Sequence, residues 1–332
     1  MYVPSEELKE RYVLATQQGV GPDLLMGPNE WVRELADEGV VRPIDPEEYG
    51  INAYMPASLT ALRYLDEYYG FPMAVYPAAL YYNQNLGAAP PKTLDELLAQ
   101  ANADNSVALV PRFIPAYWGI ESFGAGLFDP TGKFTLAESG FTEWLTWLSE
   151  VSDLPGVILN PDTVALREMY IEGRVTYYVA GPEELDVLAE VMGEDAIGVA
   201  PLPSGPAGPS GPLLPVEALM LGTASSAEQT DAALAIARFL TNPQQGTTFM
   251  RELAHISANQ DVVVDRRIYP VMAGFARQAR TAVVLPNSLN RDAFYLLGDR
   301  AYANVLAGTL TPEEAVCEFG LDVIELQEYT PE

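Results

Sequence analysis

The alternation of helical and strand segments is the feature that most restricts the possible folds of this chain. The sequence predicts a helix over 163–171, a strand over 174–180 and a second helix over 182–191. Near the start, the short apolar run at 24–26 lies between two Gly-Pro pairs and predicts a buried parallel strand. Such alternation is typical of an α/β protein in which helices cover both faces of a sheet.

Local signals place further elements. Thr93 precedes Glu96 by three residues, the spacing of a capping box, so a helix is predicted to begin at about Leu94. Apolar and aromatic residues over 63–75 predict two strands joined by a tight turn. After residue 215 the sequence predicts a strand at 218–221 and helices near 228–240, 244–253, 267–280, 291–306 and 312–319.

The length and one unusual segment predict the domain organisation. A chain of 332 residues corresponds to about two domains of roughly 100–200 residues each. Hydrophobic residues make up 48% and charged residues 19%, which is enough apolar material for packed cores. Nine of the fifteen residues over 201–215 are Gly or Pro, so this segment can be neither a helix nor a central strand. We expect the chain to pass between two lobes along it.

The charge balance excludes two classes of partner. Lys and Arg number 18 against 46 Asp and Glu, a formal net charge of −28, which repels nucleic acid and anionic lipid surfaces. No run of 18 apolar residues predicts a membrane span, so no direct insertion into a membrane is expected. The first residues have no basic region followed by an apolar region, so no secretory signal is expected in this numbering.

The rarity of Cys and His excludes several kinds of chemistry. Cys317 is the single cysteine, so an internal disulfide is impossible, and Cys317 with His255 cannot supply a typical zinc site. One histidine also leaves little chance of a nucleophile–His–acid triad, and His255 is expected to be packed or hydrogen-bonded in a helix. No G-x-G-x-x-G or phosphate-binding loop is present. We expect no cofactor, no metal and no catalytic residues.

Six phrases in a fixed order carry a resemblance to a known family. They are 21–27 followed by 31–35 and Gly39; 70–74 running into 80–83; 90–97; 172–174 leading to Gly181-Pro182; 198–203; and 235–240 with Asn242-Pro243. In this order they resemble the carbohydrate-binding family of extracellular solute-binding proteins of ABC importers, the family that includes maltose-binding protein. The resemblance covers the chain to about residue 320.

The resemblance implies a two-lobed periplasmic-binding-protein fold (type II) with lobes joined by crossover strands. Lobe I is expected to hold 1–74 and 219–264, lobe II 79–214 and 270–332, and the hinge crossovers 75–78, 215–218 and 265–269. A mono- or oligosaccharide is expected in the interlobe cleft, with delivery to the membrane subunits of an ABC permease. The implied location is extracellular, periplasmic or anchored to the cell surface as a lipoprotein.

The start of the chain departs from the family pattern. The strand expected at Tyr2-Val3 is the second strand in this family, so the first strand and helix of lobe I are expected to be absent. Three explanations remain open: a late start of the sequence, a truncated form completed by another chain, or a C-terminal tail, 321–326, that fills the gap. Lobe II is expected to be intact in each case.

Sugars are bound by aromatic faces and planar polar side chains, and lobe I offers both kinds. Asn29, Glu30 and Trp31 follow the predicted strand at 24–27, at the carboxyl end where open α/β sheets present ligands. They are candidates for hydroxyl binding and for an aromatic wall, or alternatively a helix cap and a packed Trp. Tyr76 occupies the first crossover, where relatives often have an acid, and could equally be an ordinary strand aromatic. Glu217 is a carboxylate in an apolar run and is costly without a partner.

The other candidates come from the second lobe. Tyr117 and Trp118 fit the stretch where relatives stack aromatics on the sugar, although such a pair is also common in cores. Glu183 replaces the Trp that relatives often carry after Gly-Pro, and is either a hydroxyl acceptor or a favourable anion in the first turn of a helix.

Asn287 lies before the helix predicted at 291–306, and Arg291 and Tyr295 lie along it as an i, i+4 pair. Tyr295 matches a stacking position in relatives, whereas Arg291 has a salt bridge as its alternative role.

Three functions remain in competition. The leading hypothesis is a saccharide-binding protein of an ABC importer without catalytic activity. A polyamine or other small-cation binder on the same fold would suit the acidic residues. A glycosidase is also conceivable because it needs two carboxylates, but no spacing singles out such a pair.

Overall fold

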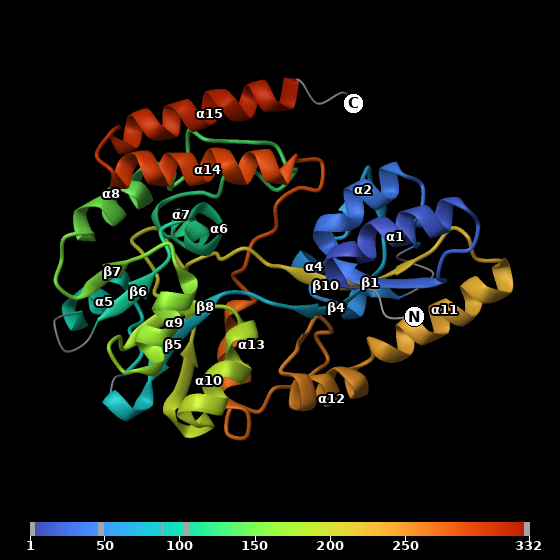
Figure 1. The fold of residues 1–332 in the computed structure, drawn as a ribbon, viewed down its shortest axis with the longest axis horizontal. Helices are drawn as coiled ribbons and strands as arrows, with labels where there is room; N and C mark the ends of the chain where they lie inside the picture. The colour runs from blue at the N-terminus through green and yellow to red at the C-terminus, as the bar shows by residue number, and fades with distance from the viewer. Residues whose placement is uncertain (1–3, 46–49, 88, 102–105, 329–332) are drawn as a thin grey trace. The chain divides into compact units, whose positions relative to one another are not determined.

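The computed structural model describes residues 4–45, 50–87, 89–101 and 106–328, and the chain divides into two compact units (Figure 1). Unit 1 holds the described residues up to Tyr76, Leu214–Val263 and Pro286–Ser288. Unit 2 holds Pro77–Leu213, Val264–Leu285 and the described residues from Leu289. The short return 286–288 to unit 1 corrects the expectation that 270–332 lies wholly in the second lobe. The strand expected at Tyr2-Val3 lies outside the described residues.

Among the described residues, unit 1 combines a four-stranded sheet with a two-stranded hairpin and with helices. Its elements are α1 (Ser5–Gln17), β1 (Leu24–Pro28), η1 (Asn29–Trp31), α2 (Val32–Asp37), η2 (Ile51–Ala53), α4 (Pro56–Thr60), β2 (Arg63–Tyr64), β3 (Glu67–Tyr68), β4 (Phe71–Val75), β10 (Val216–Leu221), α11 (Ala227–Leu240), α12 (Pro243–Leu253) and β11 (Ile256–Ser257).

The sheet of unit 1 has the strand order β1-β10-β4-β11, and its neighbouring strands are antiparallel. The prediction of a parallel strand at 24–26 is therefore wrong in its direction, although the strand itself is present. The reason lies far away in the sequence, because β1 pairs with β10, which runs back along it from Glu217 opposite Pro28 to Leu221 opposite Leu24. Leu25 and Met220 on these strands join α1 and α2 side chains in the core of unit 1.

Unit 2 is larger. Its elements are β5 (Ala79–Asn83), η3 (Gln84–Leu86), α5 (Leu94–Gln100), β6 (Val107–Leu109), α6 (Phe113–Ala116), η4 (Tyr117–Gly119), α7 (Ile120–Phe123), α8 (Phe141–Val151), β7 (Val157–Leu159), α9 (Thr163–Ile171), β8 (Tyr177–Ala180), η5 (Pro182–Glu184), α10 (Leu185–Met192), η6 (Glu194–Ala196), β9 (Ile197–Ala200), α13 (Pro270–Gln278), α14 (Arg291–Leu306) and α15 (Pro312–Glu328).

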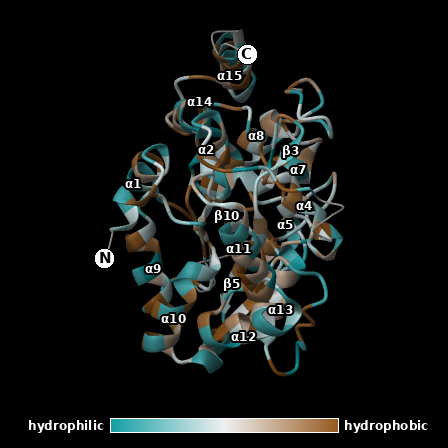
Figure 2. Cartoon of the chain, turned by 90° about the vertical axis from the view of Figure 1, so that its right-hand side faces the viewer, coloured by the Kyte–Doolittle hydropathy of each residue, from teal (hydrophilic) through white to brown (hydrophobic). Residues whose placement is uncertain are grey.

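The sheet of unit 2 is mixed and has the order β7-β6-β8-β5-β9. Strand β6 is parallel to β7 and β8, whereas β5 is antiparallel to β8 and β9. Helices such as α9 and α10 carry both hydrophobic and hydrophilic residues along their ribbons (Figure 2), as expected where one side of a helix packs and the other faces solvent.

Several local predictions are confirmed. Thr93 caps α5 by accepting a hydrogen bond from the Glu96 N–H at 3.1 Å, and α9 spans the predicted residues. No helix or strand occurs over 201–215. The suggestion that 321–326 fills a gap in lobe I is wrong, because these residues continue helix α15 of unit 2.

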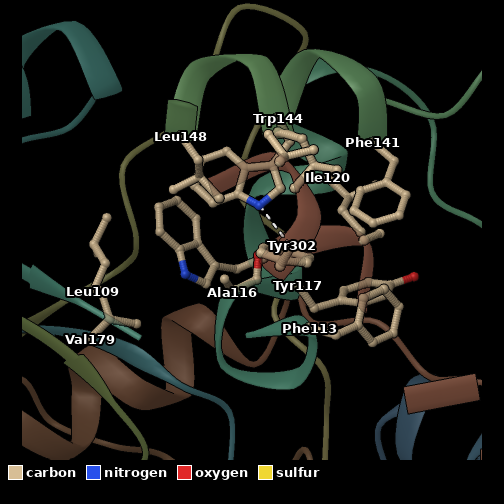
Figure 3. Close-up of a cluster of buried hydrophobic side chains, with 14 of the residues drawn as sticks. Leu109, Phe113, Ala116, Tyr117, Ile120, Phe141, Trp144, Leu148, Val179 and Tyr302 are labelled. Atoms are coloured by element: carbon tan, nitrogen blue, oxygen red, sulfur yellow. Dashed lines mark hydrogen bonds between the residues drawn. The ribbon is translucent and has the colours of Figure 1, made fainter. Parts of the chain in front are cut away.

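An aromatic cluster forms the core of unit 2 and fixes helix α14 (Figure 3). The Trp144 indole N–H donates to the Tyr302 hydroxyl at 2.8 Å, and that hydroxyl donates to the Ala116 carbonyl at 3.0 Å. Buried polar tips are thus satisfied inside an apolar cluster. Helices α14 and α15 lie side by side over it, and both contact α8 (Figure 1).

Within the described ranges, no helix is both long enough and apolar enough to cross a bilayer.

Gly298 gives a direct test of this packing. A Cβ built at Gly298 would overlap the Phe113 ring, whereas one at Gly208 would meet nothing within 4 Å. Overpacking a core costs about 1–3 kcal/mol, more than the helix propensity that Ala gains over Gly. We expect Gly298→Ala to lower the Tm measured by calorimetry and Gly208→Ala to leave it nearly unchanged. Equal Tm values for the two variants would contradict the packing described here.

Candidate functional site

Three strand ends meet at one edge of the unit 1 sheet. Strands β1 and β4 end there and β10 begins there, so Glu217 lies opposite Pro28 on one side and opposite Ala74 on the other. The β10–β4 register shifts between Glu217 and Ala218, which is a local bulge. Bulges often redirect a side chain next to a functional site. Asn29 and Tyr76, the residues that follow β1 and β4, therefore come to the same edge as Glu217.

Hydrogen bonds connect these residues. The Tyr76 hydroxyl donates to Glu217 Oε2 at 3.0 Å, and the Tyr76 N–H donates to the Pro215 carbonyl at 3.0 Å. The Asn29 side-chain oxygen accepts the Val216 N–H at 3.0 Å, and Asn29 is only 3% exposed. Asn29 therefore holds the start of β10 in place, while the half-buried Tyr76 and Glu217 form a hydroxyl–carboxylate pair.

His255 packs against Tyr76 of this pair. It follows the end of α12 rather than lying within a helix, which corrects the expectation for this residue. Its ring meets the Tyr76 ring edge-on, with centroids 5.7 Å apart and an angle of 78° between the rings. Its Nδ1 is buried without a hydrogen-bond partner. The contact with Tyr76 is therefore a packing contact.

The residues that follow β1 differ in exposure. Glu30 is exposed and Trp31 is half-buried, and a Cβ at Gly27 would lie 2.6 Å from the Trp31 ring. Gly27 thus lets the indole approach the backbone closely. Helix η1, which contains Trp31, contacts β10, so an aromatic ring lies near the polar edge of unit 1.

Asn287 has a structural role in unit 1. It is 5% exposed, and its amide nitrogen donates to the carbonyls of Ala61 at 2.8 Å and Arg63 at 3.0 Å. These bonds hold residues 286–288 to the α4–β2 region.

Two of the predicted residues of unit 2 are buried. Tyr117 and Trp118 are 2% and 1% exposed and belong to the aromatic core. Tyr117 packs on Phe113 (Figure 3). Trp118 packs on Trp144. Burial raises the pKa of the Tyr117 hydroxyl, so it stays neutral. The structure therefore places both in the core, which is the alternative role expected from the sequence.

Glu183 bends back over the turn after β8. Glu183 is partly exposed to solvent, yet its carboxylate packs on the backbone of the turn, where it would overlap a Cβ placed on Gly181. Burial of the carboxyl raises the pKa of Glu183, and hydrogen bonds from the N–H groups of Glu183 and Gly181 oppose the rise. The Gly181 carbonyl in turn accepts the Tyr81 hydroxyl at 2.9 Å. The Glu183 carboxylate and the Tyr81 hydroxyl thus both hold the backbone of this turn.

Arg291 and Tyr295 lie half-buried at the start of α14. Arg291 donates to the Leu285 carbonyl at 3.2 Å, and the Tyr295 ring lies 6.4 Å from the Phe113 ring. The Tyr295 ring therefore borders the aromatic core while remaining partly exposed.

Sequence reasoning missed Glu121, a half-buried carboxylate on α7. The Glu121 carboxylate packs closely on the backbone of two glycines. A Cβ on Gly126 would lie 2.6 Å from Glu121 Oε1, and a Cβ on Gly211 would overlap Glu121 Oε2. Burial raises the pKa of Glu121 to about 7, with no other cause. The available signal was a carboxylate in the apolar stretch 117–123, the argument that identified Glu217.

No group of three or more His, Cys, Asp or Glu side chains that could hold a metal ion occurs in 4–45, 50–87, 89–101 or 106–328. The arrangement offers carboxylates, hydroxyls and partly exposed aromatic rings, which are suited to binding polar small molecules.

The fold is that of two-lobed periplasmic binding proteins. A cyclo/maltodextrin-binding protein solved with maltotetraose matches with a TM-score of 0.87 at 23% identity, covering 100% of this chain and 89% of that one. An extracellular solute-binding protein from Staphylococcus aureus solved with maltose matches with a TM-score of 0.86 at 20% identity, covering 100% and 90%.

The sequence identifies the family. The family model of bacterial extracellular solute-binding proteins matches residues 1–267, and the chain belongs to this family. A maltotriose-binding protein from Pyrococcus abyssi is 28% identical over 85% of this chain and 65% of its own length. A galactooligosaccharide-binding protein from Bacillus subtilis is 22% identical over 90% of this chain and 75% of its own length. The chain thus spans just under two thirds of the first relative.

The hydrogen bond that the Val216 N–H donates to the Asn29 side chain is expected to stabilise the fold. Asn29→Ala leaves the buried Val216 N–H without its acceptor, at a cost of about 1–3 kcal/mol. Asn29→Asp keeps an acceptor oxygen at the same place and should lose less. We expect urea unfolding to rank the proteins wild type, Asn29→Asp, Asn29→Ala from most to least stable. An Asn29→Ala protein as stable as wild type would contradict this role.

The raised pKa of Glu121 predicts that the stability of the fold depends on pH. Its pKa is about 7 in the folded chain against an ordinary value of 4.5, so the folded state binds a proton more tightly than the unfolded state. The contribution of Glu121 to the free energy of unfolding is therefore fully present below pH 4.5. It is lost as the pH rises towards 7, which lowers the free energy of unfolding by up to about 3 kcal/mol.

The variant Glu121→Gln should remove this dependence and unfold later than wild type at neutral pH. Measuring Tm from about pH 5 to about pH 8 checks it. Glu143→Gln, at an exposed position on α8, is the matched control. Parallel Tm curves for wild type and Glu121→Gln would show that the carboxyl titrates normally.

Proposed function

We propose that this chain is the substrate-binding component of an ABC importer that binds an oligosaccharide and delivers it to the permease subunits. The observation that carries the proposal is the Tyr76–Glu217 pair at the strand edge of unit 1, near the half-buried Trp31. Hydroxyl–carboxylate pairs bind sugar hydroxyls and aromatic faces stack on sugar rings. The named relatives and structural neighbours, which bind maltooligosaccharides or galactooligosaccharides, support this ligand class.

In this proposal each unit supplies its own contacts. In unit 1, Glu217 accepts hydrogen bonds from sugar hydroxyls, Tyr76 orients it, and Glu30 and Trp31 border the ligand. In unit 2, Glu183, Arg291 and Tyr295 supply a carboxylate, a guanidinium and a stacking ring. Asn29 and Asn287 contribute through the backbone groups that they hold. No residue is assigned a catalytic role.

The location follows from the same proposal. Members of the family are described as extracellular, and an importer needs its binding protein on the outer side of the membrane. We propose that the protein works in the periplasm or at the cell surface, with a lipid anchor as one way of staying there.

Ligand screening tests the function. Thermal shift with maltose, maltotriose, maltotetraose and galactooligosaccharides should give a saturable rise in Tm with at least one of them, because ligand that binds only the folded state stabilises it. Spermidine tests the alternative of a cation binder, and hydrolysis of nitrophenyl glycosides tests for a glycosidase. A shift with spermidine alone, or turnover of a glycoside, would overturn the proposal.

Variants of the pair test the site. We expect Glu217→Gln to weaken saccharide binding by about 10- to 100-fold, the value of a charged hydrogen bond, and Tyr76→Phe to weaken it less. Calorimetric titration gives both numbers. Glu228→Gln, an exposed change in the same unit, should bind as wild type does. Undiminished binding by Glu217→Gln would place the site elsewhere while leaving the function standing.

A further inference from the structure

Glu121 lies against the segment through which the chain leaves unit 2. Its Oε2 is packed on Gly211, and the chain enters unit 1 at Leu214, three residues later. The neighbouring residues are paired as well, because the Ser122 and Ser210 hydroxyls lie 2.8 Å apart. Helix α7 thus contacts this segment through two consecutive residues. Glu121 contacts it through its carboxylate, and Ser122 contacts it through a neutral pair of hydroxyls.

A hydrogen-bond network holds the neutral half of this contact. The Gln278 amide donates to the Ser210 carbonyl at 3.2 Å and to the Thr281 hydroxyl at 2.8 Å, and the Thr281 hydroxyl donates to the same carbonyl at 2.8 Å. Every one of these groups is uncharged, so the network does not change with pH.

A second crossing segment joins the first at the same place. The Val283 N–H donates to the Pro212 carbonyl at 2.8 Å, and Leu213 and Val283 form a parallel bridge. Two residues after Val283, at Leu285, the chain again leaves unit 2. The carboxylate of Glu121 therefore lies beside the pairing of two segments that both lead into unit 1.

The surroundings of Glu121 provide no compensating charge. The segments 124–127, 210–213 and 281–283 contain no titratable side chain. Tyr117, on the preceding turn, is neutral, and Arg291 on α14 donates to the Leu285 carbonyl instead. Among the described residues, none donates a hydrogen bond to the Glu121 carboxylate. An ionised carboxylate without donors is best solvated by moving away from Gly211.

We propose that Glu121 is a proton-controlled latch on these crossing segments: protonated, it keeps 210–213 seated on α7, and ionised, it loosens them. The consequence for ligand binding rests on the proposed function. Six residues after Gly211 comes Glu217, whose position depends on the same continuous segment through Pro215 and Val216. Ligand binding, which needs Glu217 in place, is then linked to proton uptake, and affinity falls as the pH rises through neutrality.

Amide hydrogen exchange tests the latch without any ligand. After correction for intrinsic rates, we expect protection over 211–216 and 283–285 to fall several-fold in wild type between about pH 6 and about pH 8. Glu121→Gln and Glu121→Met, both of similar size and uncharged, should keep the protection at both pH values, and Glu143→Gln should behave as wild type. Protection that is independent of pH in wild type, or that falls equally in the Glu121 variants, overturns the proposal.

Titration calorimetry with maltotriose adds the functional arm. In two buffers of different ionisation enthalpy near neutral pH, wild type should take up a fraction of a proton on binding, and its Kd should rise with pH by at most about tenfold per unit. Glu121→Gln should show neither effect. Binding without proton uptake overturns the link to ligand while leaving the proposed function intact. If maltotriose does not bind, the proposed ligand is wrong, and hydrogen exchange alone decides whether the latch exists.

Discussion

The position of strand β10 is the constraint on which the polar edge of unit 1 depends. This strand lies between β1 and β4 and reaches them only after the chain has completed most of unit 2. Its register places Glu217 between Pro28 and Ala74, and the bond from Asn29 to Val216 fixes its first residue. A slip of one residue would turn Glu217 to the other face of the sheet. The arrangement of polar side chains at this edge of unit 1 therefore depends on a long-range strand pairing.

Much of the fold follows from local sequence signals. Helices with caps and regular spacing, such as α5 and α9, are predicted well because hydrogen bonds and apolar periodicity within a few residues determine them. The direction of β1 is not predictable in this way, because a buried apolar run looks the same whether its partner is parallel or antiparallel. The partner, β10, lies almost two hundred residues later, and no local signal encodes that choice.

The candidate site, too, is predictable from the sequence only where local signals determine it. The chemical types at the edge of unit 1 can be read from the sequence, and Glu217 stands out as a carboxylate in an apolar run. Whether an aromatic such as Trp118 faces solvent or core depends on the neighbours that tertiary packing supplies, here Trp144. Glu121 escapes notice for a related reason, since its carboxylate packs on a backbone that only folding brings to it, that of Gly211, ninety residues later in the sequence.

The distribution of the four tryptophans has a spectroscopic consequence. Trp118, Trp144 and Trp147 lie together in unit 2, with the rings of Trp144 and Trp147 stacked at 5.1 Å and Trp118 at 4.7 Å from Trp144, whereas Trp31 is alone in unit 1. Rings this close exchange excitation energy, so the emission of unit 2 is that of a coupled cluster rather than of three separate indoles. Replacing Trp31 would leave a chain whose tryptophan emission comes from unit 2 alone, and the difference between its emission and that of the wild type would report on unit 1.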